Sequence, residues 1–244
     1  MTQTKSIDLA GRSLFVGLPT YDYKLHIGTV SGLLKLSQEV MALGVALRLG
    51  TVCGCSVISR ARNVAVHDFL DTDATDLLFV DSDISFDGQD ALRLMAAATD
   101  KDIVAGVYEA RMPGKVYNVT LDLKDGAVLM DDNGLVRVQR VGTGFMLIRR
   151  HVLRRMQDEH PEWEYYDPIA KASMWSIFDF KSTREAYIGE DYLFCDRARE
   201  MGFEIWVDPS LKLGHMGNHE YISEFGKDAL YPAMGNNRPM SIAA

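Results

Sequence analysis

Long apolar runs, cysteines and positive charges are scarce in this chain of 244 residues. No apolar run approaches the roughly 20 residues that cross a bilayer, so we expect no stable membrane insertion. The start, Met1 to Arg12, is polar and lacks the apolar segment of a signal peptide. We therefore expect a cytoplasmic location, which for a viral protein means the host cytoplasm.

The three cysteines fit neither a disulfide framework nor a zinc site. Cys53 and Cys55 form a C-x-C pair, which is neither a redox nor a zinc spacing, and Cys195 lies far along the chain. We expect free thiols. The formal net charge of -8 argues against a protein that binds nucleic acid through charge alone, because such proteins carry a basic face.

The first half of the chain alternates apolar runs with segments of helical periodicity. This strand–helix alternation predicts right-handed crossovers and an α/β domain whose central sheet is mainly parallel and flanked by helices. Asp87 is positioned to cap the third of these helices. The expected strands are Leu14–Leu18, Val45–Leu49, Leu77–Val80 and Ile103–Tyr108, and the expected helices are Ile27–Leu43, a helix opening with Ser59 as N-cap, and Asp87–Ala98.

The second half changes character. Asp125-Gly126 and Asn133-Gly134 are strong hairpin signals, so we expect an antiparallel insertion between Val119 and Val141. The aromatic-rich stretch Glu162–Lys181 has no clear period and predicts a long functional loop. A buried strand at Phe145–Ile148, a helix from about His151 to before Pro161, a helix at Gly189–Met201, a strand at Phe203–Val207 and an extended piece at Leu211–His215 complete the expected elements.

Asp81-Ser82-Asp83 follows directly on four consecutive apolar residues, Leu77 to Val80. Such a run predicts a strand buried on both faces, and ligands of open α/β sheets bind at the carboxyl ends of such strands. Two carboxylates at this edge suit a hard divalent cation whose remaining positions go to water and substrate phosphate. An ordinary acidic turn is the alternative for these residues taken alone.

Four motifs stand in a characteristic order. They are Asp81-Ser82-Asp83 at a strand end, Gly142-Thr143-Gly144 before a buried strand, Gly189-Glu190-Asp191 at a helix start, and a late His215. This order resembles the glycosyltransferase A (GT-A) fold, in particular the family 2-like inverting nucleotide-sugar glycosyltransferases, from about Leu14 to His215. The resemblance implies a single GT-A-like, Rossmann-like domain that transfers a sugar to an acceptor hydroxyl.

The resemblance also implies roles for these residues. Asp83 and His215 would ligate Mn²⁺ or Mg²⁺, with Asp81 on the ribose or on a metal-bound water, and imidazole favours Mn²⁺. Asp191 matches the general base of the family, and its neighbour Glu190 would bind the acceptor or substitute for it. Because the macrodipole favours acidic residues at any helix start, Glu190 and Asp191 have a purely structural alternative.

A nucleotide-sugar donor is the expected partner, with UDP-hexose as the default. Arginine pairs with diphosphate oxygens in bidentate geometry, and glycine permits close backbone approach to a ligand. Solvated helix charges are the alternative for the arginines. The expected donor-binding residues are Pro19, Thr20, Tyr21, Arg60, Arg62, Asn63, Asp81, Ser82, Gly142, Thr143 and Gly144.

The whole chain, 1–244, is expected to be one domain, with a nucleotide-binding part at about 12–110, an acceptor and metal part at about 111–220, and a tail at 221–244. The acceptor is open among a glycan, a protein, a lipid and a modified DNA base, and the oligomeric state is open.

Three other functions remain. One is a haloacid dehalogenase-like phosphohydrolase with Asp81 as nucleophile, although that motif normally lies on the first strand. The second is a sugar-nucleotide pyrophosphorylase, although Leu14–Tyr23 lacks the Gly-rich basic loop that opens such enzymes. The third is a non-catalytic nucleotide-sugar binder.

Overall fold

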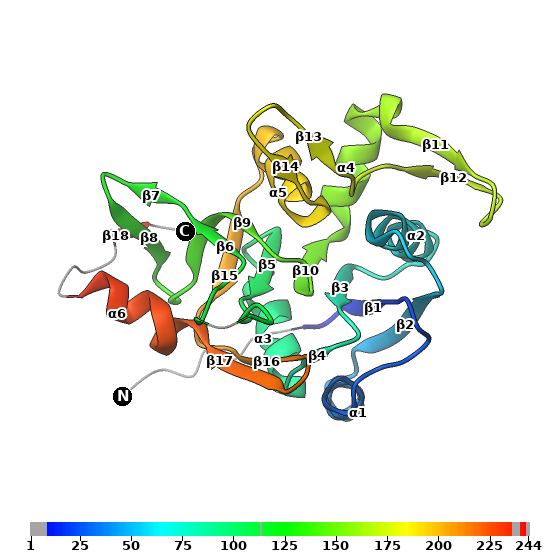
Figure 1. The fold of residues 1–244 in the computed structure, drawn as a ribbon. Helices are drawn as coiled ribbons and strands as arrows, with labels where there is room; N and C mark the ends of the chain where they lie inside the picture. The colour runs from blue at the N-terminus through cyan, green and yellow to red at the C-terminus, as the bar shows by residue number, and fades with distance from the viewer. Residues whose placement is uncertain (1–8, 113, 236–239, 243–244) are drawn as a thin grey trace.

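A mixed β-sheet forms the centre of the molecule (Figure 1). The computed structural model describes residues 9–112, 114–235 and 240–242. The main path of the sheet has the order β18-β8-β9-β15-β5-β10-β3-β1-β2. Its strands are β1 (Ser13–Thr20), β2 (Ala46–Cys53), β3 (Asp76–Val80), β5 (Ile103–Gly106), β8 (Ala127–Asp131), β9 (Val136–Val141), β10 (Phe145–Arg149), β15 (Ile205–Asp208) and β18 (Met240–Ile242), with β6 (Val119–Leu121) beside β9 and β7 (Leu123–Lys124) beside β8.

Strand direction decides which chain segments meet at the edge of the sheet where β3 and β5 end. β1, β2, β3, β5 and β15 run in one direction, as expected from the sequence. β10 runs the opposite way between β3 and β5. The start of β10 therefore lies beside the carboxyl ends of its two neighbours.

Helices cover both faces of the sheet, with α1 and α2 on opposite sides of β1 and β2 (Figure 1). Along β3, Leu78 and Val80 pack on the side of α1 and α3, whereas Leu77 and Phe79 pack on the side of α2, α4 and α5, as the two-residue period of a strand requires. The helices are α1 (Ile27–Ala42), α2 (Ile58–Leu70), α3 (Gly88–Ala97), α4 (Arg150–Glu159), α5 (Glu190–Glu200) and α6 (Tyr231–Met234), with a 3-10 turn at Pro161–Trp163 and a π-helical turn at Gly226–Leu230. Within the described residues, no helix has both the length and the apolarity to cross a bilayer.

Several local expectations are confirmed. Asp87 caps α3 in a capping box, accepting from the Gln89 amide while Asp90 accepts from the Asp87 amide. The two predicted turns connect β7, β8 and β9 in antiparallel pairs. Two expectations are wrong, the N-cap of α2 and the long loop at Glu162–Lys181. Val57 is the N-cap of α2 in place of Ser59, which lies within the helix.

The stretch predicted as a long loop, Glu162–Lys181, instead contains the hairpin of β11 (Glu164–Asp167) and β12 (Ala172–Trp175). A bidentate ion pair between Arg60 on α2 and Asp167 anchors this hairpin to the body, a contact 107 residues apart in the chain. No local pattern reports such a contact. A second small pair, β13 (Lys181–Ser182) and β14 (Tyr187–Ile188), follows it.

A separate antiparallel sheet connects the late part of the chain to the segment after Asp83. β16 (Lys212–Met216) pairs with β17 (Glu220–Glu224) on one side and with β4 (Ile84–Ser85) on the other. His215 lies opposite Ile84 in this register. The late histidine is therefore held next to Asp83 by backbone pairing.

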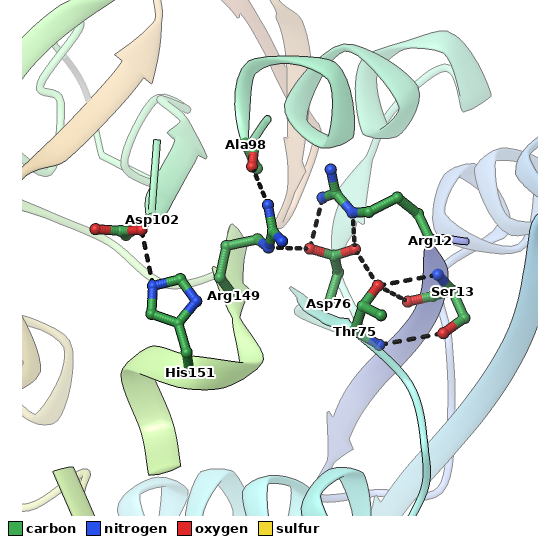
Figure 2. Close-up of polar contacts among 8 residues, drawn as sticks. All are labelled: Arg12, Ser13, Thr75, Asp76, Ala98, Asp102, Arg149 and His151. Atoms are coloured by element: carbon green, nitrogen blue, oxygen red, sulfur yellow. Dashed lines mark hydrogen bonds and ion pairs between the residues drawn. The ribbon is translucent and has the colours of Figure 1, made fainter. Parts of the chain in front are cut away.

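A buried carboxylate lies at the amino end of β3, far along the strand from Asp81. Asp76 is fully buried and accepts from Arg12 Nε (2.7 Å), Arg12 Nη2 (2.6 Å) and the Thr75 hydroxyl (2.7 Å). Arg149 Nε at the end of β10 lies 3.2 Å from the same carboxylate. Figure 2 shows both guanidinium groups at the Asp76 carboxylate, with Arg12 bound to both oxygens and Arg149 beside one of them. This cluster joins β1, β3 and β10, the strands that carry the functional edge.

Candidate active site

Asp81 and the glycine loop meet at the carboxyl edge of β3. Because β10 is antiparallel to β3, the loop Gly142–Gly144 precedes it at this same edge. The Asp81 amide donates to the Gly144 carbonyl (2.9 Å), and the Gly144 amide donates to the Tyr108 hydroxyl (3.0 Å). Thr143 between the glycines is buried, and its hydroxyl lacks a hydrogen-bond partner within the described residues. The structure thus brings the first two motifs into direct contact.

Arg62 connects Asp81 to the third motif. Its guanidinium lies 3.0 Å from Asp81 Oδ1 (Nη1), donates to Asp81 Oδ2 (3.2 Å) from Nη2 and donates to Glu190 Oε1 (3.2 Å) from Nε. Only 3% of the Arg62 side chain is exposed. Burial lowers its pKa, but the charges of Asp81 and Glu190 outweigh burial and raise the pKa. The guanidinium therefore stays charged and pairs with both carboxylates.

Asp191 is a half-buried carboxylate at the first turn of α5. It accepts from Asn118 Nδ2 (2.9 Å) at Oδ2 and from its neighbouring Tyr192 amide (2.8 Å) at Oδ1. Burial and the adjacent charge of Glu190 raise its pKa. A carboxylate whose pKa is raised accepts a proton more readily than an exposed one, which suits a general base.

Asp83 and His215 form a second pair at this edge, with Asp83 Oδ2 3.7 Å from His215 Nε2. The Met216 amide donates to the Asp83 carbonyl (2.8 Å), which fixes the spacing of the two segments. Burial raises the pKa of Asp83, but His215 and Arg111 outweigh burial and lower the pKa. Asp83 is therefore a carboxylate at neutral pH.

The orientation of His215 suits a metal ligand. Its Nδ1 lies 2.8 Å from the Glu109 carbonyl oxygen, which can only accept, so Nδ1 carries a proton and Nε2 is the ring nitrogen that faces Asp83. Metal-bound histidines commonly donate their other N–H in this way. The described residues contain no group of three or more His, Cys, Asp or Glu side chains placed to hold a metal. A cation held by Asp83 and His215 alone would have to complete its coordination with water and ligand phosphate.

The end of β1 contributes Pro19 and Thr20, both buried, and the exposed Tyr21. The Thr20 hydroxyl donates to the Lys24 carbonyl (2.8 Å), so it braces its own loop. The carbonyl of Ser82 accepts from the His26 amide (2.9 Å) and the Thr29 hydroxyl (3.1 Å), which docks the segment Asp81–Asp83 on the start of α1.

Arg60 and Asn63, which lie on α2 like Arg62, make their contacts with residues other than Asp81 and Glu190. The Arg60 guanidinium donates twice to Asp167 (2.7 and 2.8 Å) and once to Cys55 Sγ (3.3 Å), and Asn63 exchanges two 2.9 Å hydrogen bonds with the main chain of Phe178. The structure thus brings Arg62, of the three predicted α2 residues, to the Asp81 end. The predicted contact of Arg60 and Asn63 with a donor stays a prediction.

Four residues of the site were missed from the sequence, namely Tyr108, Glu109, Arg111 and Asn118. Tyr108 follows β5 at the same carboxyl edge as Asp81, so the strand-end argument could have found it. Burial and the charge of Asp81 raise its pKa, which keeps the hydroxyl protonated beside Gly144. Asn118 contacts Asp191 over 73 residues of chain and has no local signal.

Gly144→Ala is expected to destabilise the fold by about 1–3 kcal/mol, the usual cost of overpacking. A Cβ here would lie 2.5 Å from the Tyr108 hydroxyl and 2.8 Å from Asp81 Oδ2. Urea unfolding measures the loss. In a Tyr108→Phe background the same substitution should cost less, because one obstacle is gone. An equal cost in both backgrounds would place the strain elsewhere.

No protein-family model matches the chain, and no curated protein matches it in sequence. Solved structures do match. The crystal structure of A197 from STIV superposes with a TM-score of 0.52 at 19% identity, over 84% of this chain and 86% of that chain. This likeness shows a shared fold. The fold is of the GT-A type, as expected from the sequence.

Weaker matches include glycosyltransferases. Residues 1–349 of S. aureus TarS match with a TM-score of 0.43 at 15% identity, over 91% of this chain and 63% of that fragment. A Drosophila β1,4-galactosyltransferase 7 mutant in complex with manganese, UDP-Gal and xylobiose matches with a TM-score of 0.46 at 12% identity, over 93% of this chain and 76% of that one.

Proposed function

We propose that this protein is a metal-dependent glycosyltransferase that moves a sugar from a nucleotide-sugar donor, UDP-hexose by default, to an acceptor hydroxyl with inversion. One observation carries the proposal: a candidate cation-binding pair, Asp83 and His215, lies at the same sheet edge as Asp191, a half-buried carboxylate with a raised pKa. Asp81 belongs to both groups, through the chain to Asp83 and through Arg62 to Glu190. The GT-A fold agrees with this use of the edge.

The donor side of the reaction requires stabilisation of a departing diphosphate. Asp83 and His215 would hold Mn²⁺ or Mg²⁺, which supplies Lewis-acid stabilisation of that leaving group when bound. Asp81, paired with Arg62, would accept a hydrogen bond from the ribose or from a metal-bound water. The glycine loop, in which Gly144 packs closely against Tyr108 and Asp81, would line the donor-sugar side of Asp81.

The acceptor side requires removal of one proton. Asp191 takes the proton from the acceptor hydroxyl, the hydroxyl oxygen forms a bond to the anomeric carbon, and the bond from that carbon to the diphosphate oxygen breaks. The nucleoside diphosphate leaves with that electron pair. Attack opposite to the leaving group inverts the anomeric configuration, which NMR of the product measures. Asn118 holds Asp191 in place through Oδ2.

The test is a donor panel. The protein is incubated with nucleotide sugars and Mn²⁺, and nucleoside diphosphate release is measured with a glycan, a protein, a lipid and a hydroxymethylated DNA base as acceptors. Release of nucleoside diphosphate with a mass increase on one acceptor supports the proposal. Orthophosphate release from phosphate esters indicates a phosphohydrolase, and donor binding without turnover on any acceptor indicates a binding protein.

We propose that the reaction takes place in the cytoplasm.

Asp83→Ala should abolish metal-dependent nucleotide binding. Calorimetric titration with UDP in the presence and absence of Mn²⁺ is expected to show a metal-dependent gain for the wild type and none for the variant, because the variant lacks the anionic ligand of the cation. Asp71→Ala is the control, since that carboxylate is 76% exposed and pairs with His67 at 3.8 Å. Retained affinity in Asp83→Ala would move the metal to other residues.

A further inference from the structure

A polar hollow of about 420 Å³ lies beside Asp83, on the side where Arg111 contacts it. Its walls are His26, Arg111, Met216, Gly217, Asn218 and Tyr221. Three of these residues touch the Asp81–Asp83 segment directly. The His26 amide donates to the Ser82 carbonyl, the Met216 amide donates to the Asp83 carbonyl, and Arg111 pairs with the Asp83 carboxylate. The hollow is therefore contiguous with the proposed cation site.

Arg111 occupies the face of Asp83 that a cation would need. Its Nη1 lies 2.7 Å from Asp83 Oδ2 and donates to the Met216 carbonyl (3.2 Å). The same oxygen, Oδ2, faces His215 Nε2. A divalent cation and a guanidinium cannot both sit against one carboxylate oxygen without strong repulsion at these distances. A cation bound at Oδ2 beside His215 would therefore displace Arg111.

The hollow is a place where the displaced Arg111 guanidinium could bind a phosphate group. Arg111 is about half exposed on its wall, and the wall at His26 is the N-cap of α1, the positive end of a 16-residue helix with no acidic residue in its first turn. Helix N-termini favour phosphate groups, and arginine binds them in bidentate geometry. As defined by the described residues, the lining includes no carboxylate.

The two arginines that the sequence predicted for the diphosphate already pair with carboxylates in the structure. Arg62 is buried between Asp81 and Glu190, and Arg60 is held by Asp167. Freeing Arg62 would leave two carboxylates without their counter-ion in a largely buried cluster, which is costly. Releasing Arg111 costs far less, because its partner Asp83 gains a cation in exchange.

We propose that the hollow is the diphosphate subsite and that Arg111 exchanges Asp83 for the phosphates when a divalent cation binds Asp83 and His215. The proposal rests on the proposed function and deepens it. Arg111 acts twice, as the counter-ion of Asp83 without the cation and as a diphosphate-binding residue with it. This exchange predicts opposite effects of one substitution on two ligands.

The substitution is Arg111→Gln, with Arg48→Gln as the control. Arg48 is more than half exposed and pairs with the exposed Asp73, so the control makes the same change in net charge. Mn²⁺ alone is titrated by the loss of its free-ion electron paramagnetic resonance signal. Arg111→Gln should bind it about threefold more tightly than wild type, because no guanidinium competes. Inorganic pyrophosphate with Mg²⁺ is titrated by calorimetry, and Arg111→Gln should bind it about tenfold or more weakly.

Arg48→Gln should leave both affinities unchanged. Tighter Mn²⁺ binding combined with weaker pyrophosphate binding supports the proposal, and a folding defect cannot produce that pair. Unchanged affinities, a loss of both, or absence of binding of either ligand to wild type and variant would overturn it. If donor turnover occurs while these affinities are unchanged, the proposed function stands and this subsite fails. If both affinities shift as expected without turnover on any donor, the subsite stands and the transferase activity fails.

Discussion

Asp76→Ala is expected to lower the free energy of unfolding by about 3–5 kcal/mol, the cost of leaving a buried ion pair without one partner. The carboxylate is fully buried and binds both Arg12 and Arg149. Without the carboxylate, the two guanidinium groups drawn in Figure 2 would lie close together with no counter-ion between them. The Arg12 side chain is only 11% exposed, so water replaces the lost partner poorly.

Urea unfolding monitored by tryptophan fluorescence measures this change. Asp71→Ala, a largely exposed carboxylate, is the control and should change stability by no more than about 0.5 kcal/mol. Arg12→Met with Asp76→Leu should recover part of the loss, because apolar residues of similar size often replace buried ion pairs without penalty. A loss below about 1 kcal/mol for Asp76→Ala would show that the strands at this end do not depend on the carboxylate.

The parts of the fold that could be predicted are those that local physics determines. The apolar run Leu77–Val80 needs two covered faces, and the structure gives it two. The turn glycines Gly126 and Gly134 adopt positive φ (79° and 85°), which suits a residue without Cβ, and the hairpin signals were therefore reliable. The strand-end argument placed Asp81 at the carboxyl end of β3 because the apolar run before it does form a strand.

The parts that could not be predicted depend on contacts between distant segments. Arg12 reaches Asp76 across 64 residues, and Arg62 reaches Glu190 across 128. The alternation of strands and helices does not reveal that β10 is antiparallel, although this direction brings Gly144 to Asp81. Arg111 lies in a segment for which the sequence predicts no helix or strand. Its 2.7 Å contact with Asp83 in the structure is what gives it a role.

The second large effect is expected from removal of the proposed general base, Asp191. Asp191→Asn is expected to lower kcat for sugar transfer by about 10²–10⁴-fold, the usual contribution of general base catalysis. Donor affinity should stay near that of wild type, because Asp83 and His215 are unchanged. Glu190→Gln is the matched comparison: it removes the neighbouring charge and weakens the pair with Arg62, and should cost less than Asp191→Asn. Near-normal turnover in Asp191→Asn would falsify the assignment of the base.

The pH profile separates a lost base from a damaged fold. Only ionised Asp191 accepts a proton, so wild-type kcat/KM should fall as pH drops through the pKa of Asp191, which burial and Glu190 raise above 3.8. The variant should lack this limb. Because a raised carboxylate pKa means that folding disfavours the charged form, the neutral Asn removes that cost at neutral pH, and the unfolding midpoint should not decrease. A variant that keeps the limb would assign the proton transfer to another group, with Glu190 the first to test.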